Sequence, residues 1–224
     1  MKPIARTHRC LWPLLLAILS AALLPSRADS QPREPVGPFA ADVRIALPRF
    51  KDDPGVSADL GVATANLPTR GLGLVAGGHW YPVGKGRVTL GLGGELLVSG
   101  ATKTLDAAED DPASVEGPAV RTRFWSISPQ VSLNFGTGRG WSYLTGGLGW
   151  GGFKTELEAS PVGDAESGPR VLNYGGGARW FAKEHVAFAI DLRFYAVNAQ
   201  LASTNRPAYP SMTLMVFSAG VSFK

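Results

Sequence analysis

The stretch "NYGGGARWFAKEHVAFAIDLRFYAV", residues 173–197, joins a glycine-rich run to a segment of strict alternation. In its second half every second residue is bulky and apolar: Phe188, Ile190, Leu192 and Phe194. Asp191 and Arg193 stand between them. A period of two is that of a β-strand, whose successive side chains point to opposite faces. Apolar bulk on one face, with glycine and charge on the other, favours a strand of a membrane barrel, whose apolar face meets lipid and whose polar face lines the interior.

The same period recurs along the chain and predicts eight strands. We expect them at residues 41–50, 71–81, 87–99, 122–135, 141–153, 171–181, 186–197 and 213–223. Short connections around "PVGKG", "GTGRG" and "AKEH" alternate with long polar ones at 51–70, 100–121, 155–170 and 198–212. This rhythm is typical of an antiparallel up-and-down barrel with tight turns at one end and extended loops at the other. Strands of about ten residues are long enough to cross a bilayer when tilted.

The beginning of the chain resembles a secretory signal peptide, which we place at residues 1–28. Lys2, Arg6 and Arg9 precede an apolar stretch at residues 11–24, and Ser26-Arg27-Ala28 has the small-x-small pattern of a cleavage site. The apolar stretch is shorter than the roughly 20 residues of a spanning helix. We therefore expect residues 29–38 to be a linker and residues 39–224 to form the barrel domain.

The charge balance changes once this segment is removed. The chain has 22 Lys and Arg against 18 Asp and Glu, but four of the basic residues lie within residues 1–28, which leaves 18 of each sign. The basic character of the whole chain is thus no argument for nucleic-acid binding. The single cysteine, Cys10, also falls in this segment, so the mature chain has no disulfide framework and no cysteine-based metal site.

Charged residues fall on the face that we predict to point into the barrel: Asp42, Arg44, Glu95, Arg179, Asp191 and Arg193. They comprise three acids and three bases. An unpaired charge in a confined interior is costly, so these side chains should neutralise one another. The sequence therefore predicts a buried cluster of salt bridges that fills the lumen and has a structural role.

Aromatic residues gather beside the short turns: Trp80, Tyr81, Trp141, Tyr143, Trp180 and Phe181. Aromatic rings favour the membrane interface, and barrels carry girdles of them. We predict these six to form one interfacial girdle, with Trp125, Trp150 and Phe153 in a second one near the long loops.

The signal peptide, the hairpin "GGGARWF…AFAIDLRFYAV" and the final strand "TLMVFSAGVSFK" together resemble the outer membrane protein β-barrel domain family. These are small eight-stranded barrels similar to the transmembrane domain of outer membrane protein A. The resemblance covers the chain from about residue 38 onward. It implies an envelope anchor, adhesin or small-molecule-interacting barrel without a shared enzymatic activity. It also implies that the last strand is read by the barrel assembly machinery, although here Lys224 follows Phe223 where the family usually ends in an aromatic.

Other chemistry has weaker support in the sequence. Two glycine-rich runs, 71–77 and 147–152, are followed by no helix, as a nucleotide-binding loop would require. His79 and His185 are the histidines of the mature chain, too few for a zinc site, and both are expected near the interface. The acidic segment 104–117 could hold a divalent cation, but its spacing does not match a calcium loop: it carries Asp106, Glu109, Asp110, Asp111 and Glu116.

The sequence thus predicts an all-β integral barrel in the outer membrane of a Gram-negative-type bacterium, with a structural or surface-interaction role. No cofactor is expected. The predicted partners are outer-membrane lipid and the assembly machinery, with no nucleic acid and an unknown extracellular partner. Two alternatives stay open. A soluble exported lipocalin-like barrel would bury its apolar residues and expose Glu95, Arg179 and Asp191. An outer-membrane lipid-modifying enzyme would need a reactive group near the rim.

Overall fold

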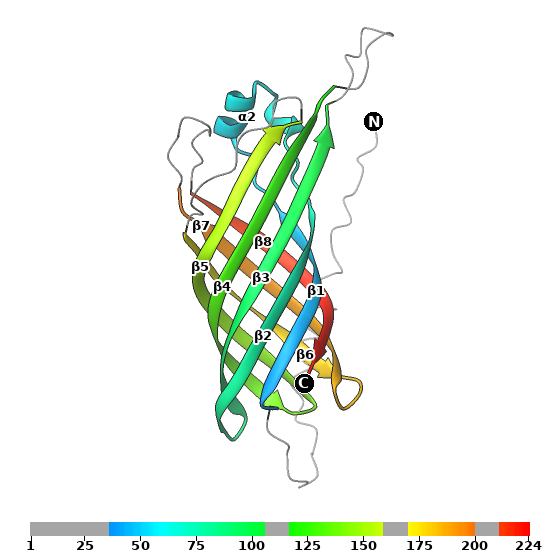
Figure 1. Ribbon diagram of the computed structural model, residues 1–224, viewed down its shortest axis with the longest axis vertical. Coiled ribbons are helices and arrows are strands. Elements are labelled where there is room, and N and C mark those ends of the chain that lie inside the picture. Colours follow the sequence, from blue (N-terminus) through cyan, green and yellow to red (C-terminus); the bar gives the residue numbers. More distant parts are fainter. Residues whose placement is uncertain (1–35, 106–116, 159–169, 200–210) are drawn as a thin grey trace, which may run out of the picture. The chain divides into compact units, whose positions relative to one another are not determined.

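The computed structural model describes residues 36–105, 117–158, 170–199 and 211–224. Within them, eight antiparallel strands form a closed up-and-down barrel in which each strand pairs with its sequence neighbours and β8 closes on β1 (Figure 1). The strands are β1 Phe39–Arg49, β2 Leu72–Lys85, β3 Val88–Thr104, β4 Ala119–Thr137, β5 Gly140–Leu157, β6 Arg170–Phe181, β7 Val186–Val197 and β8 Met212–Phe223. This confirms the predicted fold class.

Three strands are longer than the sequence pattern suggested. β3, β4 and β5 continue beyond the predicted ends at the side of the barrel where the long connections lie, here called the long-loop end. The opposite side, with the connections at 86–87, 138–139 and 182–185, is called the short-turn end. β2 also reaches Lys85, through a register shift between Trp80 and Val83. Pro82 lies at this irregularity, where its missing N–H costs no regular ladder bond.

A short helix and a 3₁₀ turn interrupt the first long connection, which the sequence reading treated as a plain loop. Helix α2, Pro54–Leu60, begins after Asp53, whose carboxylate accepts hydrogen bonds from the N–H groups of Gly55 and Val56. It ends at Gly61 in the left-handed conformation, a position that glycine fills without steric cost. The turn η1, Thr64–Asn66, follows. Figure 1 shows α2 at the long-loop end of the barrel.

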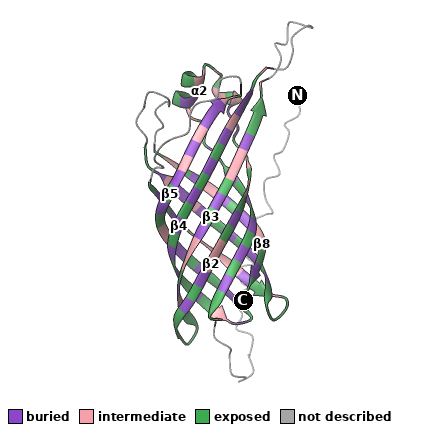
Figure 2. Ribbon diagram, viewed as in Figure 1, coloured by how far each residue is buried: buried purple, intermediate pink, exposed green. Residues whose placement is uncertain are grey.

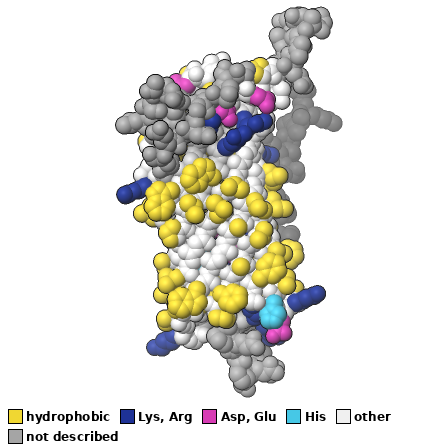
Figure 3. Space-filling model, in the orientation of Figure 1, with side chains coloured by type: hydrophobic (Ala, Val, Ile, Leu, Met, Phe, Trp, Pro, Cys, Tyr) yellow, Lys and Arg dark blue, Asp and Glu magenta, His cyan; other side chains and the backbone are white. Residues whose placement is uncertain are grey.

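Burial alternates along every strand, as Figure 2 shows. The outward residues form an exposed apolar belt to which all eight strands contribute. On the face that Figure 3 shows, hydrophobic side chains lie over the middle of the barrel, and most Lys, Arg, Asp and Glu side chains lie toward its two ends. Examples of belt residues from successive strands are Ile45, Leu74, Leu92, Ile127, Leu148, Leu172, Phe188 and Phe217.

Some predictions concern parts of the chain outside the described residues. These are the signal peptide at 1–28, most of the linker at 29–38, and the acidic side chains Asp106, Glu109, Asp110, Asp111 and Glu116. Within the described ranges, none of the helices has the length and apolar character needed to cross a bilayer.

Candidate functional site

The interior of the barrel is the candidate site, and its side chains form three layers. The charge cluster consists of Asp42, Arg44, Glu95, Arg179, Asp191 and Arg193, all of which the structure buries inside the barrel. Toward the short turns lies the aromatic floor of Val36, Ala40, Tyr81, Trp141 and Tyr143. Toward the long loops lies the apolar layer, which includes Val75, Leu97, Val120, Phe124, Phe153, Val171, Val197, Leu214 and Val216.

Glu95, from β3, is the centre of the charge cluster. Its Oε2 lies 2.6 Å from Nη2 of Arg44, and its Oε1 lies 3.2 Å from Nη1 of Arg193. The hydroxyl of Tyr195 donates a further hydrogen bond of 2.6 Å to Oε1. One carboxylate on β3 therefore connects β1 and β7 across the lumen.

Asp191 joins the same network from β7. It accepts hydrogen bonds from Nε and Nη2 of Arg193, at 3.2 and 3.0 Å, and from the hydroxyl of Tyr143 at 2.9 Å. Nη1 of Arg44 lies 3.2 Å from Oδ2 of Asp191. Because Arg44 and Arg193 each contact both Glu95 and Asp191, the four charges form a closed square rather than two separate pairs.

Arg179 and Asp42 form a second, bidentate pair. Nε and Nη2 of Arg179 donate to the two carboxylate oxygens of Asp42, at 3.0 and 2.5 Å. The guanidinium also lies over the ring of Tyr143, 4.3 Å from its centroid. Parallel hydrogen bonds and a cation–π contact hold the charge in one orientation. The six charges sum to zero, which is the condition under which a buried ionic cluster is tolerated.

Polar side chains continue the cluster along the inner face of β4. Gln130 donates to Oδ1 of Asn173 at 3.1 Å and accepts from Thr145 at 3.4 Å. Asn134 donates to Oγ of Ser132 and to the carbonyl of Thr89, at 2.9 and 3.2 Å. This neutral network ties β3, β4, β5 and β6 together inside the barrel.

The aromatic girdle differs from the prediction. Trp80 and Trp180 point outward and are 57 % and 53 % exposed, but Tyr81, Trp141 and Tyr143 are buried inside the barrel. Phe181 is half-buried and stacks on Trp141, with ring centroids 5.1 Å apart. In the second girdle, Trp125 and Trp150 are exposed, whereas Phe153 is buried in the apolar layer.

The parity of the strands explains this correction. Adjacent residues of a strand point to opposite faces, so Trp80 and Tyr81 cannot both face outward, and neither can Tyr143 and Leu144. Strand parity also reveals two residues whose part in the charge cluster the sequence analysis missed. Tyr143 and Tyr195 have the inward parity of their strands, and both donate to carboxylates of the charge cluster.

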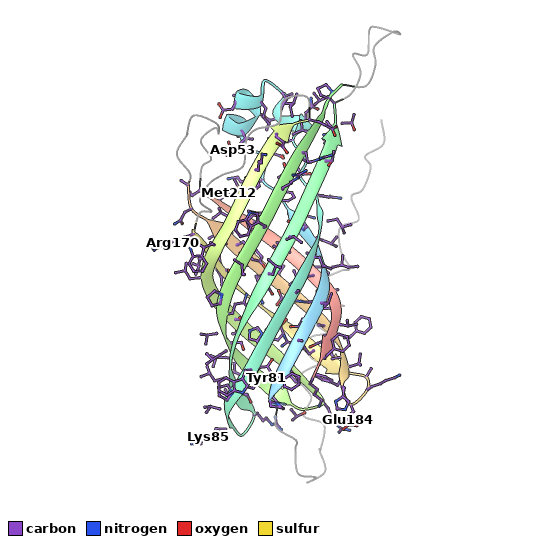
Figure 4. The ribbon with its side chains drawn as sticks, viewed as in Figure 1. Asp53, Tyr81, Lys85, Arg170, Glu184 and Met212 are labelled. Carbon is purple, nitrogen blue, oxygen red and sulfur yellow. The ribbon has the colours of Figure 1, made fainter. Side chains whose placement is uncertain are left out.

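The apolar layer is a second correction, because polar and small residues were expected throughout the lumen. At the long-loop end the interior is apolar. Val56 of α2 and Leu67 cover it on the side of the long connections and belong to the same buried cluster. A cavity in this region is lined by Phe50, Val56, Leu67, Phe153 and Met212, and it holds only about 10 Å³, the space of one water. Figure 4 shows Asp53 and Met212 at this end and Tyr81, Lys85 and Glu184 at the other.

The two histidines lie in different surroundings. His79 is buried in the lumen, stacked against Tyr81 at 6.4 Å, so the prediction of an interfacial position is wrong for this residue. His185 is exposed in the connection between β6 and β7. Among the described residues, no three His, Cys, Asp or Glu side chains are grouped as a metal site would require.

Comparisons with known proteins bear on the fold. No protein-family model and no curated protein matches the sequence. Among solved structures, Neisserial surface protein A is similar with a TM-score of 0.50 and 14 % identity, covering 84 % of this chain and 97 % of that one. The chain has the fold of the small outer-membrane β-barrels.

Other solved structures resemble the barrel less closely. The attachment invasion locus protein Ail of Yersinia pestis, in complex with sucrose octasulfate, has a TM-score of 0.45 and 15 % identity, over 83 % of this chain and 97 % of that one. The outer membrane protease OmpT from Escherichia coli has a TM-score of 0.42 and 8 % identity, over 83 % and 96 %. At such identities the likeness concerns the fold alone.

Proposed function

We propose that the protein is an integral barrel of a Gram-negative-type outer membrane, delivered there after cleavage of a signal peptide, with a structural or surface-interaction role and no enzymatic activity. The observation that carries the proposal is the inverted arrangement of the barrel. An apolar belt faces outward on all eight strands, while a neutral cluster of six charges is buried in the centre.

The apolar belt supports a lipid environment. Soluble monomers rarely expose a continuous apolar patch of more than a few hundred Å², because such surfaces aggregate. Here all eight strands contribute exposed apolar residues, and Figure 3 shows those on one face of the barrel. A soluble lipocalin-like barrel would show Glu95, Arg179 and Asp191 on its surface, but all three are buried.

The filled interior supports an anchor rather than a pore. Eight strands enclose a lumen only wide enough for side chains, and wide diffusion channels need about 16–18 strands. The aromatic floor, the charge cluster and the apolar layer occupy successive levels of this lumen. We therefore expect the protein to hold loops at the cell surface without conducting solutes.

The charge cluster supports a structural role for the ionisable groups. Glu95, Asp191 and Asp42 each contact arginine, and the hydroxyl groups of Tyr143 and Tyr195 donate hydrogen bonds to carboxylates. These groups are engaged with one another rather than presented to a substrate. The long-loop end, where β3, β4 and β5 extend, is where a surface partner would bind, because loops positioned by a rigid scaffold commonly carry function.

The last strand supports recognition by the barrel assembly machinery. Phe223 points outward and is 44 % exposed, so its ring is available on the outer face. The side chain of Lys224 turns the other way: its Nζ donates to the carbonyl of Gly138 at 2.6 Å and lies 4.6 Å from the centre of the Phe181 ring. The side chain of Lys224 thus leaves the ring of Phe223 uncovered on the outer face.

The membrane proposal is tested by fractionation and gel mobility. The protein should stay with membranes after carbonate extraction and should migrate differently on a gel before and after boiling. Purified protein in planar bilayers should give no steady conductance. Recovery in the periplasmic supernatant would refute the membrane location, and a stable open channel would refute the anchor role.

A pair of substitutions locates the lipid boundary. Leu148→Arg places a charge in the middle of the exposed belt, where Leu148 is 54 % exposed, and should lower the free energy of unfolding by about 2–4 kcal/mol. Thr104→Arg places the same side chain at an exposed position at the long-loop end of β3 and should have little effect. Urea unfolding in lipid vesicles measures both, and equal effects would contradict a lipid-facing belt.

A further inference from the structure

The outer faces of β1 and β2 change abruptly from apolar to basic at the long-loop end. Along β1 the outward residues Val43, Ile45 and Leu47 are apolar and exposed, and the next outward residue is Arg49. On the neighbouring strand Leu74 and Leu72 are also exposed, and the next outward position is Arg70. Arg49 and Arg70 are bridge partners, so two guanidinium side chains lie opposite each other directly at the edge of the belt.

The backbone places these two arginines in the closer of the two kinds of antiparallel pair. The N–H of Phe50 donates to the carbonyl of Thr69 at 2.9 Å, and the N–H of Gly71 donates to the carbonyl of Pro48 at 3.1 Å. These bonds flank Arg49 and Arg70 rather than joining them, which makes the two residues a non-hydrogen-bonded antiparallel pair. In such a pair the Cα atoms are about 4.5 Å apart and the side chains are at their nearest.

Like charges directly opposite each other destabilise a sheet. Both side chains are exposed, and neither guanidinium group has a hydrogen bond or ion pair with another described residue. The pair therefore costs the isolated protein free energy without a compensating internal contact. An anion bound between the two guanidinium groups would remove this repulsion.

A second basic pair lies at the same end on the neighbouring strands β4 and β5. Arg123 and Lys154 are partners in the ladder, immediately beyond the partners Trp125 and Gly152. Lys154 also forms an ion pair with Glu156 at 2.9 Å, so this pair is partly compensated. The recurrence of two opposed cations just past the belt indicates a property of this rim rather than of one position.

We propose that Arg49 and Arg70 bind the phosphate of an anionic lipid headgroup in the leaflet at the long-loop end. A guanidinium presents a planar fork of N–H donors that matches a phosphate, and two forks can hold one phosphate from both sides. The acyl chains of such a lipid would lie against Leu47 and Leu72, each two residues from its arginine on the same outer face. A phosphorylated lipid thus matches the site in charge and in apolar surface, whereas a free phosphate matches the charge alone. This inference rests on the membrane location proposed above.

Binding of a phosphorylated glycolipid to the full mature chain, refolded in detergent micelles, tests the site. Native mass spectrometry would compare retention of diphosphorylated lipid A with that of its dephosphorylated form. We expect wild type to retain the phosphorylated lipid preferentially, and Arg49→Gln/Arg70→Gln to weaken that binding about tenfold or more. Arg49→Lys/Arg70→Lys keeps the charge without the fork and should be intermediate.

Arg87→Gln/Lys183→Gln removes two exposed charges at the short-turn end and serves as the matched control, with no expected loss. Equal retention by wild type and Arg49→Gln/Arg70→Gln, or equal retention of the two lipids, overturns the inference. So does displacement of the lipid by equimolar pyrophosphate, since a lipid site should prefer the amphiphile. A heat-dependent gel shift in every variant shows that the barrel is folded and inserted. Its absence in wild type would instead refute the membrane proposal.

Discussion

The two ends of β4 have opposite amphipathic order. Toward the short turns its inward residues are polar and its outward ones apolar: inward Ser126, Ser128, Gln130, Ser132 and Asn134, outward Ile127, Val131, Leu133 and Phe135. Toward the long loops the inward residues are Val120, Thr122 and Phe124, and the outward ones are Arg121 and Arg123. The change occurs at the same level on both faces, between Phe124 and Ser126 inside and between Arg123 and Trp125 outside.

This difference agrees with the proposed membrane location, because the medium outside a strand determines which face can be apolar. Where lipid surrounds the barrel, the hydrophobic effect gives no reason to bury leucine inside, and the interior is held by charge pairs and hydrogen bonds. Where water surrounds it, burial of apolar surface again stabilises the fold by about 25 cal/mol per Å². The long-loop ends of β3, β4 and β5, together with α2, thus enclose a buried apolar cluster like that of a small soluble protein.

The largest effect is expected from the charge cluster. Glu95→Gln removes the carboxylate that Arg44, Arg193 and Tyr195 share and leaves the lumen with one excess positive charge. Breaking a buried ion pair on one side should lower the free energy of unfolding by about 3–5 kcal/mol. Urea titration followed by the gel-mobility shift measures this value.

Two further variants show whether the loss comes from the charge imbalance of the cluster or from altered packing. Glu184→Gln, in an exposed turn, should leave stability unchanged. Glu95→Gln/Arg44→Gln restores neutrality with two acids and two arginines, and it should cost less than the sum of the single changes, since contacting residues couple. Additive losses would show that the cluster acts through packing rather than through charge balance.

A smaller effect is expected in the apolar layer. Leu97 points inward and is fully buried, while its neighbour Leu96 points outward and is 42 % exposed. Leu97→Ala should cost about 2–3 kcal/mol, toward the lower end for a buried leucine. The reason is that the layer adjoins α2 and Leu67, here called the lid, which can move into the space left by the substitution. Leu96→Ala should cost less, since lipid can fill the space. The reverse order in urea unfolding would contradict the assignment of inside and outside.

Period-two alternation predicted the strand count and the inward direction of the six charges, and the rhythm of short and long connections predicted the antiparallel order. It succeeded for β6, β7 and β8 within one residue at each end, because these strands stay in one environment and keep one amphipathic order. It stopped short on β3, β4 and β5, because beyond Val98, Trp125 and Trp150 the apolar residues change face and the pattern looks like the start of a loop.

The aromatic residues show a different limit. Trp141 and Tyr143 lie beside a short turn, and composition alone favours an interfacial girdle there. Strand parity, which the same sequence provides, assigns both to the lumen, where the structure has them. The pairings within the charge cluster are a third case. Glu95 contacts Arg193 and Arg44 rather than Arg179 because the register of all eight strands sets their levels, and alternation within one strand carries no information on register.

The smallest effect is expected in the lid, and it tests whether the long-loop end is a separate unit of stability. Asp53→Ala removes the cap that accepts hydrogen bonds at 2.8 and 3.2 Å from the N–H groups of Gly55 and Val56, and should destabilise α2 by about 1 kcal/mol. Hydrogen exchange at the backbone N–H groups of residues 55–60 should accelerate about fivefold, while the urea midpoint of the barrel stays unchanged. Asp53→Asn retains an acceptor oxygen and should exchange like wild type. A fall in the urea midpoint of the barrel with Asp53→Ala would mean that the lid and the charge cluster unfold together. The two ends would then differ in composition, but they would not be separate units of stability.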